Sequence, residues 1–169
     1  EYDSVYICGY EIEGDGGDQI IDFLEKNRDL NIYYAPGPRI TYISKEKHDR
    51  IMKLHPVLHL NEKEAIDFTG GGSMEEAAQK FEQMTENRVI ITAGSKGAYL
   101  QENGQGTLIP SEKAVVVDTI GAGDSHIGAV ISAVMCRKSF EAAIAVANKV
   151  SAAVVGVEGP SISEEEFQQ

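Results

Sequence analysis

The stretch "DTIGAGD", residues 118–124, places two carboxylates on either side of a Gly-Ala-Gly turn. The apolar run "AVVV" (114–117) precedes it, and "SHIGAVISAVM" (125–135), with apolar residues at helical spacing, follows it. This order predicts a buried strand that passes through a glycine-rich turn into a helix. A helix N-terminus has unpaired N–H groups that bind anions, and glycine lets an anion approach closely. The stretch therefore predicts either an anion cradle at 121–123 or a tight turn with Asp124 as its N-cap.

The two interpretations give Asp124 different roles. A carboxylate beside an anion cradle would repel a phosphate rather than bind it. It is better suited to take a proton from a hydroxyl group that attacks the phosphate. As an N-cap, the same carboxylate would only stabilise the helix. The residues alone leave both roles open.

Strand-like and helix-like segments alternate along the rest of the chain. β-Branched and aromatic residues predict strands at 4–10, 31–36, 57–61 and 88–94. Helical spacing predicts helices at 17–29, 44–55 and 73–87, and two long ones after 119. This alternation is typical of a mostly parallel, doubly wound sheet in a three-layer α/β/α sandwich. We expect a single α/β domain over residues 1–169.

Local signals refine this outline. Ser73 and Glu76 have capping-box spacing at the start of the third helix. Asn103-Gly104 is typical of the turn of a hairpin over 97–110. Ligands in parallel α/β sheets lie at the carboxyl ends of the strands. The unusual residues follow predicted strands at those ends: Asn61, Thr92 to Gly97 and Asp118 to Asp124.

Composition excludes several classes of protein. The net charge of −12 argues against a nucleic-acid partner. No apolar run approaches 18 residues and no leader is recognisable, so we expect a soluble protein without a membrane span. Cys8 and Cys136 lie in apolar stretches, which predicts buried free thiols in a reducing, cytoplasmic compartment. The chain begins with Glu1 rather than Met, which suggests a piece of a longer protein.

Three motifs resemble one known family. "DTIGAGDSHIGA" (118–129) resembles the C-terminal signature of the ribokinase (PfkB) carbohydrate kinases, Asp-Thr-x-Gly-Ala-Gly-Asp, and matches all its fixed positions. "NEKE" (61–64) is similar to the family's Asn-x-x-Glu at the end of a strand. "TAGSKG" (92–97) is similar to its Thr-x-Gly-x-x-Gly nucleotide loop. The three motifs stand in the family's order, and the resemblance implies a ribokinase-like fold.

The resemblance implies a site for ATP and Mg²⁺. Asp124 would be the catalytic base, and the backbone amides of Gly121, Ala122 and Gly123 would form the anion hole for the transferred phosphoryl group. Asn61 and Glu64 would hold magnesium and the nucleotide phosphates, largely through water. The nucleotide site would be lined by Thr92, Gly94 and Gly97, with the segment around Asn148 near the adenine.

Many members of this family are activated by a monovalent cation. The resemblance implies a potassium site formed by Asp118, the carbonyl of Ile120 and the C-terminal loop "VGVEGPSIS" (155–163), with Ser163 as a ligand. The alternative for Asp118 is a brace that holds the N-terminal turn in place.

Several residues depart from the family pattern or lie outside it. His126 stands where most relatives carry an apolar or aromatic residue; packing against the next strand, or exposure to solvent, is favoured over a proton relay. Arg39 in "APGPR" (35–39) either approaches the nucleotide or acceptor or belongs to a proline-stiffened loop. Lys96 is interpreted as a solvated loop residue rather than a phosphate ligand. The remaining histidines, which lack metal-ligand spacing, are interpreted as ordinary surface or core residues: His48, His55 and His59.

The resemblance covers only about the C-terminal half of such a kinase. The N-terminal half would carry the acceptor contacts and a β-sheet lid that often mediates homodimers. We therefore expect an ATP-dependent kinase of a small carbohydrate in the intact protein, and an inactive fragment here. A nucleoside kinase and a non-catalytic nucleotide-binding regulatory domain are the alternatives. The glycine patterns of dinucleotide-binding and P-loop proteins are absent.

Overall fold

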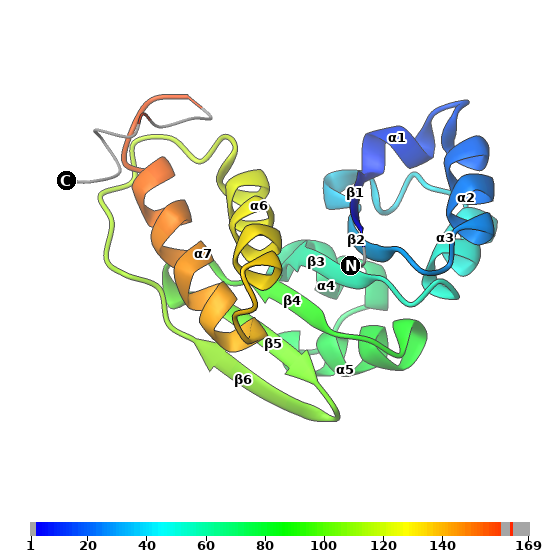
Figure 1. Ribbon diagram of the computed structural model, residues 1–169. Coiled ribbons are helices and arrows are strands. Elements are labelled where there is room, and N and C mark those ends of the chain that lie inside the picture. Colours follow the sequence, from blue (N-terminus) through cyan, green and yellow to red (C-terminus); the bar gives the residue numbers. More distant parts are fainter. Residues whose placement is uncertain (1–2, 160–162, 164–169) are drawn as a thin grey trace. The chain divides into compact units, whose positions relative to one another are not determined.

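A computed structural model describes residues 3–159 and 163 (Figure 1). The strands are β1 (Ser4–Cys8), β2 (Asn31–Ala35), β3 (Val57–Asn61), β4 (Val89–Thr92), β5 (Ala98–Glu102) and β6 (Gln105–Ile109). The α-helices are α1 (Gly9–Glu13), α2 (Gly17–Lys26), α3 (Lys45–Met52), α4 (Glu62–Thr69), α5 (Met74–Thr85), α6 (Ala122–Met135) and α7 (Phe140–Val154). Two short 3₁₀ helices, η1 (Gly37–Arg39) and η2 (Gly94–Lys96), lie in loops.

The strands pair in their sequence order, β1-β2-β3-β4-β5-β6. β1, β2 and β3 are parallel neighbours, with Ser4 opposite Asn31 and Tyr33 opposite Val57. Helices connect them, as parallel pairing requires. β5 and β6 form the predicted hairpin, and Asn103 and Gly104 at its turn have φ of 53° and 75°, as a type I′ turn requires. The sheet is mixed and flanked by helices, which confirms the predicted three-layer α/β class.

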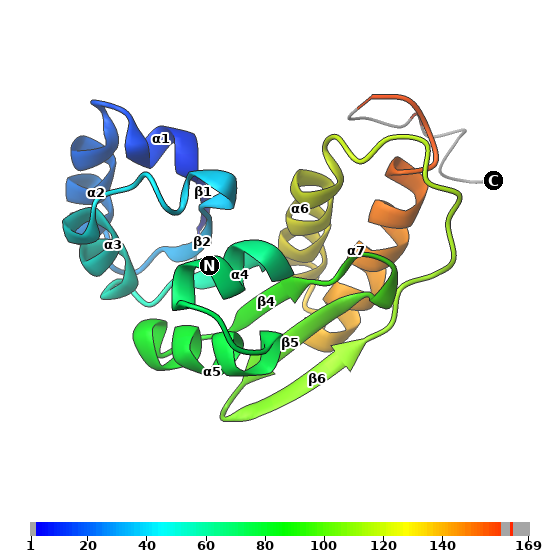
Figure 2. The same ribbon diagram turned by 180° about the vertical axis from the view of Figure 1, so that it is seen from behind.

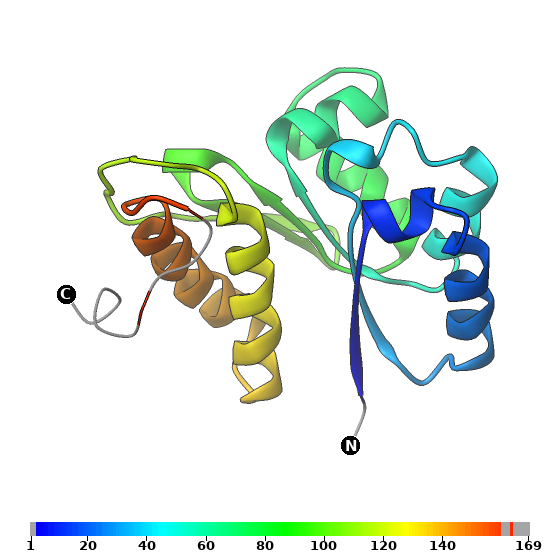
Figure 3. The ribbon, with the colours of Figure 1, turned by 90° about the horizontal axis from the view of Figure 1, so that it is seen from above.

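Its internal contacts divide the chain into two compact units. The first unit holds the described residues up to Ile91 together with Gln101–Gly106. Within it, β1 and β2 run side by side in the same direction (Figure 3). α4 and α5 lie next to each other (Figure 2), and both contact β3. Its core consists of fully buried side chains from strands and helices alike, among them Leu24, Tyr34, Leu58 and Phe81.

The second unit holds Thr92–Leu100 and the described residues from Thr107 onward. In it α6 and α7 pack side by side (Figure 1, yellow and orange). Ile127 and Ile144 are among the side chains buried in these two helices. The Ser151 hydroxyl of α7 also donates a hydrogen bond to the carbonyl of Ala122 (2.9 Å). α7 therefore holds the first turn of α6 in place.

β1 is shorter than the predicted strand at 4–10, because α1 begins at Gly9. A Cβ at Gly9 would lie 1.9 Å from the carbonyl oxygen of Pro36. Only glycine fits this close approach, so the chain turns from strand to helix at this residue.

The apolar run 114–117 is not the buried strand that its sequence predicts. Val115, Val116 and Val117 are exposed, Val115 to 83%. The run is anchored at its end by a hydrogen bond from the N–H of Val117 to the carbonyl of Val155 (2.7 Å). A β-rich composition forms a strand only where another strand offers a partner. Among the described residues no strand pairs with this run.

The two cysteines are also less buried than predicted. Both are free thiols, but Cys136 is exposed and Cys8 is half-buried. Cys136 follows α6 as its C-cap, beyond the turns whose apolar side chains face the interior. Within residues 3–159, no helix has the length and apolarity that crossing a membrane requires.

Candidate active site

The N-terminus of α6 is open, as an anion cradle requires. Gly121 is its N-cap in the left-handed conformation (φ 78°), which favours glycine. Gly123 is exposed, and a Cβ built on it meets no atom within 4 Å. Of the three amides of the predicted anion hole, that of Ala122 donates to the carbonyl of Thr119 (3.3 Å) within the turn. Asp124 is exposed in the same first turn of the helix.

Asp118 braces the turn that precedes α6. Its Oδ1 accepts a hydrogen bond from the N–H of Ile120 (3.0 Å), and its Oδ2 accepts one from the N–H of Gly159 (3.2 Å). These two bonds, that of Ile120 foremost, lower the pKa of the carboxyl group. Asp118 thus links the turn at Ile120 to the C-terminal loop, which is the bracing role that was the alternative. The cation site stays a prediction. Ser163 is exposed, and its role as a ligand stays a prediction.

The predicted nucleotide loop, residues 92–97, folds into η2 between β4 and β5. The N–H of Ala93 donates to the carbonyl of Gly97 across the loop (2.8 Å). Gly94 is exposed, with φ of 56°, and Lys96 is exposed as well. Gly97 is buried, with φ of 110°, and a Cβ on it would lie 2.0 Å from the carbonyl oxygen of Ile109. The shape of the loop thus depends on Gly97, whereas Gly94 leaves its backbone open.

Asn148 faces the interior of the second unit. It is 4% exposed, and its amide nitrogen donates to the carbonyls of Ile109 (2.9 Å) and Pro110 (3.1 Å). Its Oδ1 lies 3.1 Å from Nε2 of His126, which is buried too. Burial lowers the pKa of His126 to about 4, so the ring is neutral near pH 7. This favours the packing interpretation of His126 over a proton relay.

Asn61 and Glu64 meet at the start of α4, in the first unit. Asn61 Oδ1 accepts from the N–H of Glu64 (2.8 Å), and Glu64 Oε2 accepts from the N–H of Asn61 (3.0 Å). This is a capping box, so the Asn-x-x-Glu pattern has a structural role of its own. Burial raises the pKa of Glu64. A nearby cation would oppose that shift.

The donors present fit a water-coordinated magnesium better than a protein cage. Mg²⁺ prefers oxygen ligands, keeps several waters and is usually bound through one or two carboxylates and the phosphates of a substrate. Glu64 and Asn61 provide such oxygens. The described part of the chain contains no group of three or more His, Cys, Asp or Glu side chains that could enclose an ion.

Arg39 is engaged within the first unit. Its guanidinium forms a two-pronged ion pair with Glu13 and lies over the rings of Tyr10 (5.1 Å) and Tyr42 (4.4 Å). The ion pair lowers the pKa of Glu13. Sequence reasoning missed this partner, because Glu13 lies 26 residues away in the chain.

The other histidines have structural surroundings. His48 and His59 are buried, and Nε2 of His48 lies 2.7 Å from the carbonyl oxygen of Ile40. Nδ1 of His55 lies 2.9 Å from the carbonyl oxygen of Thr85. Nδ1 of His55 also lies 3.6 Å from Oε2 of the exposed Glu86. These contacts fit ordinary core and surface histidines.

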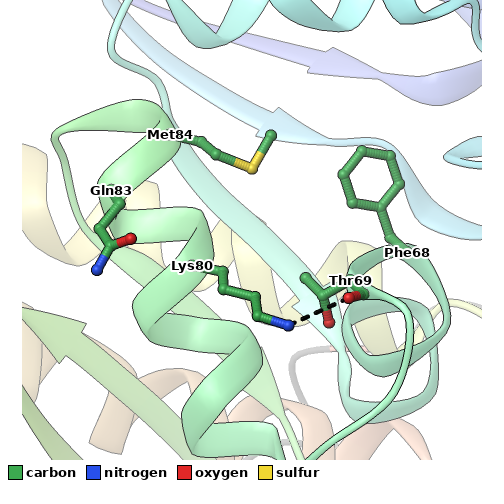
Figure 4. Close-up of a pocket in the computed structure, with 5 residues that line it drawn as sticks. All are labelled: Phe68, Thr69, Lys80, Gln83 and Met84. Atoms are coloured by element: carbon green, nitrogen blue, oxygen red, sulfur yellow. Dashed lines mark hydrogen bonds between the residues drawn. The ribbon is translucent and has the colours of Figure 1, made fainter.

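A hollow of about 430 Å³ lies between α4 and α5 (Figure 4). Phe68 and Met84 provide apolar walls, and Lys80 donates a hydrogen bond to the carbonyl of Thr69 (3.2 Å) beside it. It lies at the C-terminal end of α4, whereas Asn61 caps the other end. None of the predicted site residues lines it.

Comparison with known proteins identifies related sequences. The sequence model of the pfkB family carbohydrate kinases matches residues 1–166. The uncharacterized sugar kinase YegV of Escherichia coli (strain K12) is 30% identical over 159 residues, which are 92% of this chain and 50% of that protein. The ribokinase of Haemophilus influenzae is 30% identical over 68% of this chain and 39% of its own length. The chain thus spans half or less of the length of these two relatives.

Solved structures share the fold. The ribokinase of Thermotoga maritima has a TM-score of 0.82 and 25% identity, over 98% of this chain and 55% of its own. The aminoimidazole riboside kinase of Salmonella enterica, in complex with aminoimidazole riboside and an ATP analogue, has a TM-score of 0.84 and 18% identity, over 99% and 62%. A double mutant of Vibrio cholerae fructokinase with bound fructose, ADP and potassium has a TM-score of 0.79 and 19% identity, over 95% and 56%.

Proposed function

This chain belongs to the pfkB family of carbohydrate kinases, and we propose that it is the nucleotide-binding and catalytic part of an ATP-dependent phosphotransferase with an alcohol group as acceptor. The observation that carries the proposal is the open N-terminus of α6. Gly121 has the left-handed conformation, open space faces Gly123, and the exposed carboxylate of Asp124 lies in the same turn.

The proposed chemistry divides the work between a base and a helix N-terminus. Asp124 takes the proton from the acceptor hydroxyl, whose oxygen forms a bond to the γ-phosphorus as the bond to the bridging oxygen of ADP breaks. The amides of Gly121, Ala122 and Gly123 stabilise the charge on the transferred phosphoryl group. For all three amides to take part, the hydrogen bond from the N–H of Ala122 to the carbonyl of Thr119 would have to break. Bound magnesium would neutralise charge on the phosphates.

The remaining predicted residues complete the proposal. Asn61 and Glu64 would hold the hydrated magnesium, and Thr92, Gly94 and Gly97 would shape the nucleotide loop. Asn148 would support the adenine site from the protein interior rather than contact the nucleotide, because its amide nitrogen already donates to the carbonyls of residues 109 and 110. Asp118, the carbonyl of Ile120 and Ser163 would hold potassium in a loop that Asp118 already braces.

We propose a small carbohydrate as acceptor, since the relatives in Escherichia coli and Haemophilus influenzae carry the names sugar kinase and ribokinase. A nucleoside is the alternative acceptor. We also propose that the protein acts in the cytoplasm and has no nucleic-acid or membrane partner. The acceptor contacts, and any homodimer contact, would come from the half of the relatives' length that this chain does not span.

A calorimetric titration with a non-hydrolysable ATP analogue and Mg²⁺, with and without potassium, tests the proposal. Two glycines of α6 provide a matched pair, because a Cβ at Gly123 or at Gly128 meets no atom of the protein. Both Ala variants gain similar helix propensity. Gly123→Ala places its methyl group in the cradle and should weaken binding at least about tenfold, whereas Gly128→Ala should leave it unchanged. Equal affinities of the two variants would contradict the cradle.

A further inference from the structure

A buried hydrogen-bond network connects three elements of the second unit next to the first turn of α6. His126, 2% exposed, is two residues beyond Asp124, and its Nε2 lies 3.1 Å from Oδ1 of Asn148 on α7. The amide nitrogen of Asn148 donates to the carbonyls of Ile109 and Pro110 at the end of β6. α6, α7 and the end of β6 are therefore linked by hydrogen bonds through two side chains.

The partners in this hydrogen-bond network determine which atoms carry hydrogens. Two carbonyl oxygens can only accept, so the nitrogen of the Asn148 amide faces them and its oxygen faces His126. An amide oxygen also only accepts, so Nε2 of His126 carries the hydrogen that completes the bond. The amide oxygen and nitrogen of Asn148 and Nε2 of His126 then each have a partner of the opposite kind. A buried amide that loses one of these partners is costly to keep in place.

At β6, this hydrogen-bond network reaches the predicted nucleotide loop. The carbonyl of Ile109, which accepts from Asn148, is the same atom that would lie 2.0 Å from a Cβ at Gly97. Gly97 in turn closes the loop through its bond with Ala93 (2.8 Å). A shift of Ile109 therefore moves directly against the backbone of Gly97, because no space separates them.

At α6, the same network reaches the anion cradle. His126 is two positions beyond Asp124 in the same helix, so a displacement of the backbone at His126 also displaces that at Asp124. The bond from Ser151 of α7 to the carbonyl of Ala122 (2.9 Å) adds a second attachment of this turn to α7. α7 therefore makes hydrogen bonds both to α6 and to the end of β6.

We propose that the His126–Asn148 pair is a positioning device that sets the first turn of α6, with Asp124 and the cradle, against the loop that ends at Gly97. The inference rests on the proposed function, and His126 acts through Asn148 rather than on the nucleotide. Phosphoryl transfer depends on positioning, and a displacement of about 1 Å is costly in such a site.

Two amide variants of His126 test this with a matched geometry. The side-chain nitrogen of glutamine reaches the position of Nε2, whereas that of asparagine reaches only the position of Nδ1. H126Q should therefore keep the bond to Asn148 and bind the ATP analogue within about twofold of the unchanged chain. H126N should bind about tenfold more weakly, as loss of one buried hydrogen bond suggests.

A second readout needs no nucleotide. In the ligand-free ¹⁵N-labelled chain, H126N should shift the amide resonances of Gly97 and Ile109, while H126Q should restore them. Indistinguishable H126N and H126Q, or an unshifted Gly97 amide in H126N, would overturn the positioning role. If H126N does not fold, H126F, which fills the ring's volume without a donor, replaces it in both measurements.

The two readouts separate this inference from the proposed function. If the unchanged chain and its longer form bind no nucleotide, the proposed function fails. The Gly97 resonance still decides then whether His126 is linked to that loop. If nucleotide binds but H126N and H126Q bind it alike, the positioning role fails and the proposed function stands.

Discussion

His126 makes the stability of the folded chain depend on pH. Burial lowers its pKa from 6.5 to about 4. Between these values the unfolded chain binds a proton that the folded chain does not, so the free energy of unfolding falls as the pH decreases from about 6.5 to about 4. The loss attributable to His126 approaches about 3 kcal/mol at the lower end. Urea unfolding at pH 7, 6 and 5 should show it as a difference between the unchanged chain and H126Q.

The comparison with H126Q isolates this residue. Glutamine does not titrate, and every other group, including His48, whose pKa burial also lowers, is common to both chains. The stability advantage of the unchanged chain over H126Q should shrink steadily as the pH falls. Two pH profiles that run parallel would show that His126 is not buried as a neutral ring.

At the scale of elements, the β4–β5 loop depends on one glycine. Gly97 has φ of 110°, and a Cβ there would lie 2.0 Å from the carbonyl oxygen of Ile109. We expect Gly97→Ala to lower the free energy of unfolding by about 3 kcal/mol, from the strained backbone and the displaced carbonyl together. Chemical denaturation measures this directly.

The hairpin provides the control. Gly104 also has positive φ (75°), but a Cβ there meets no atom within 4 Å. Gly104→Ala should therefore cost only the left-handed backbone, about 1 kcal/mol. A Gly97→Ala variant as stable as Gly104→Ala would mean that Ile109 moves away easily, and the link between the end of β6 and the loop would be loose.

Elements with strong local signals were predictable from the sequence. The capping box of Ser73 and Glu76 and the turn at Asn103-Gly104 formed as predicted, because both depend on residues within one turn. The exposed run 114–117 was mispredicted, since β propensity does not reveal whether a strand partner exists.

The candidate site shows the same limit. The turn 121–123 was found from its glycines, which need no distant partner to be recognised. The bond between Asp118 and Gly159 joins residues 41 apart in the chain, and that between His126 and Asn148 joins residues 22 apart. Spacing rules describe neighbours along a helix or strand. They do not identify pairs that only packing brings together.

At the scale of the whole molecule, this chain carries one side of the proposed reaction. It spans 50% of the length of YegV, and we propose that the acceptor contacts lie in the part that it does not span. Positioning of both substrates supplies most of the rate in phosphoryl transfer. We therefore expect that the chain by itself does not transfer phosphate, and that turnover would require a longer protein that includes it.

Asp124 is the residue at which this division can be tested. In the longer protein, Asp124→Asn removes the proposed base while keeping the size and polarity of the side chain, so turnover should fall at least about a thousandfold. Affinity for the ATP analogue should stay within about threefold, since the cradle is built from backbone amides. Glu141→Gln is the matched control: Glu141 is the acidic residue in the first turn of α7, and its loss changes charge at a helix N-terminus in the same way. Turnover assays and calorimetry on both variants give the answer. If Asp124→Asn retains turnover, or if Glu141→Gln loses it equally, Asp124 is not the base, and the open N-terminus of α6 serves binding alone.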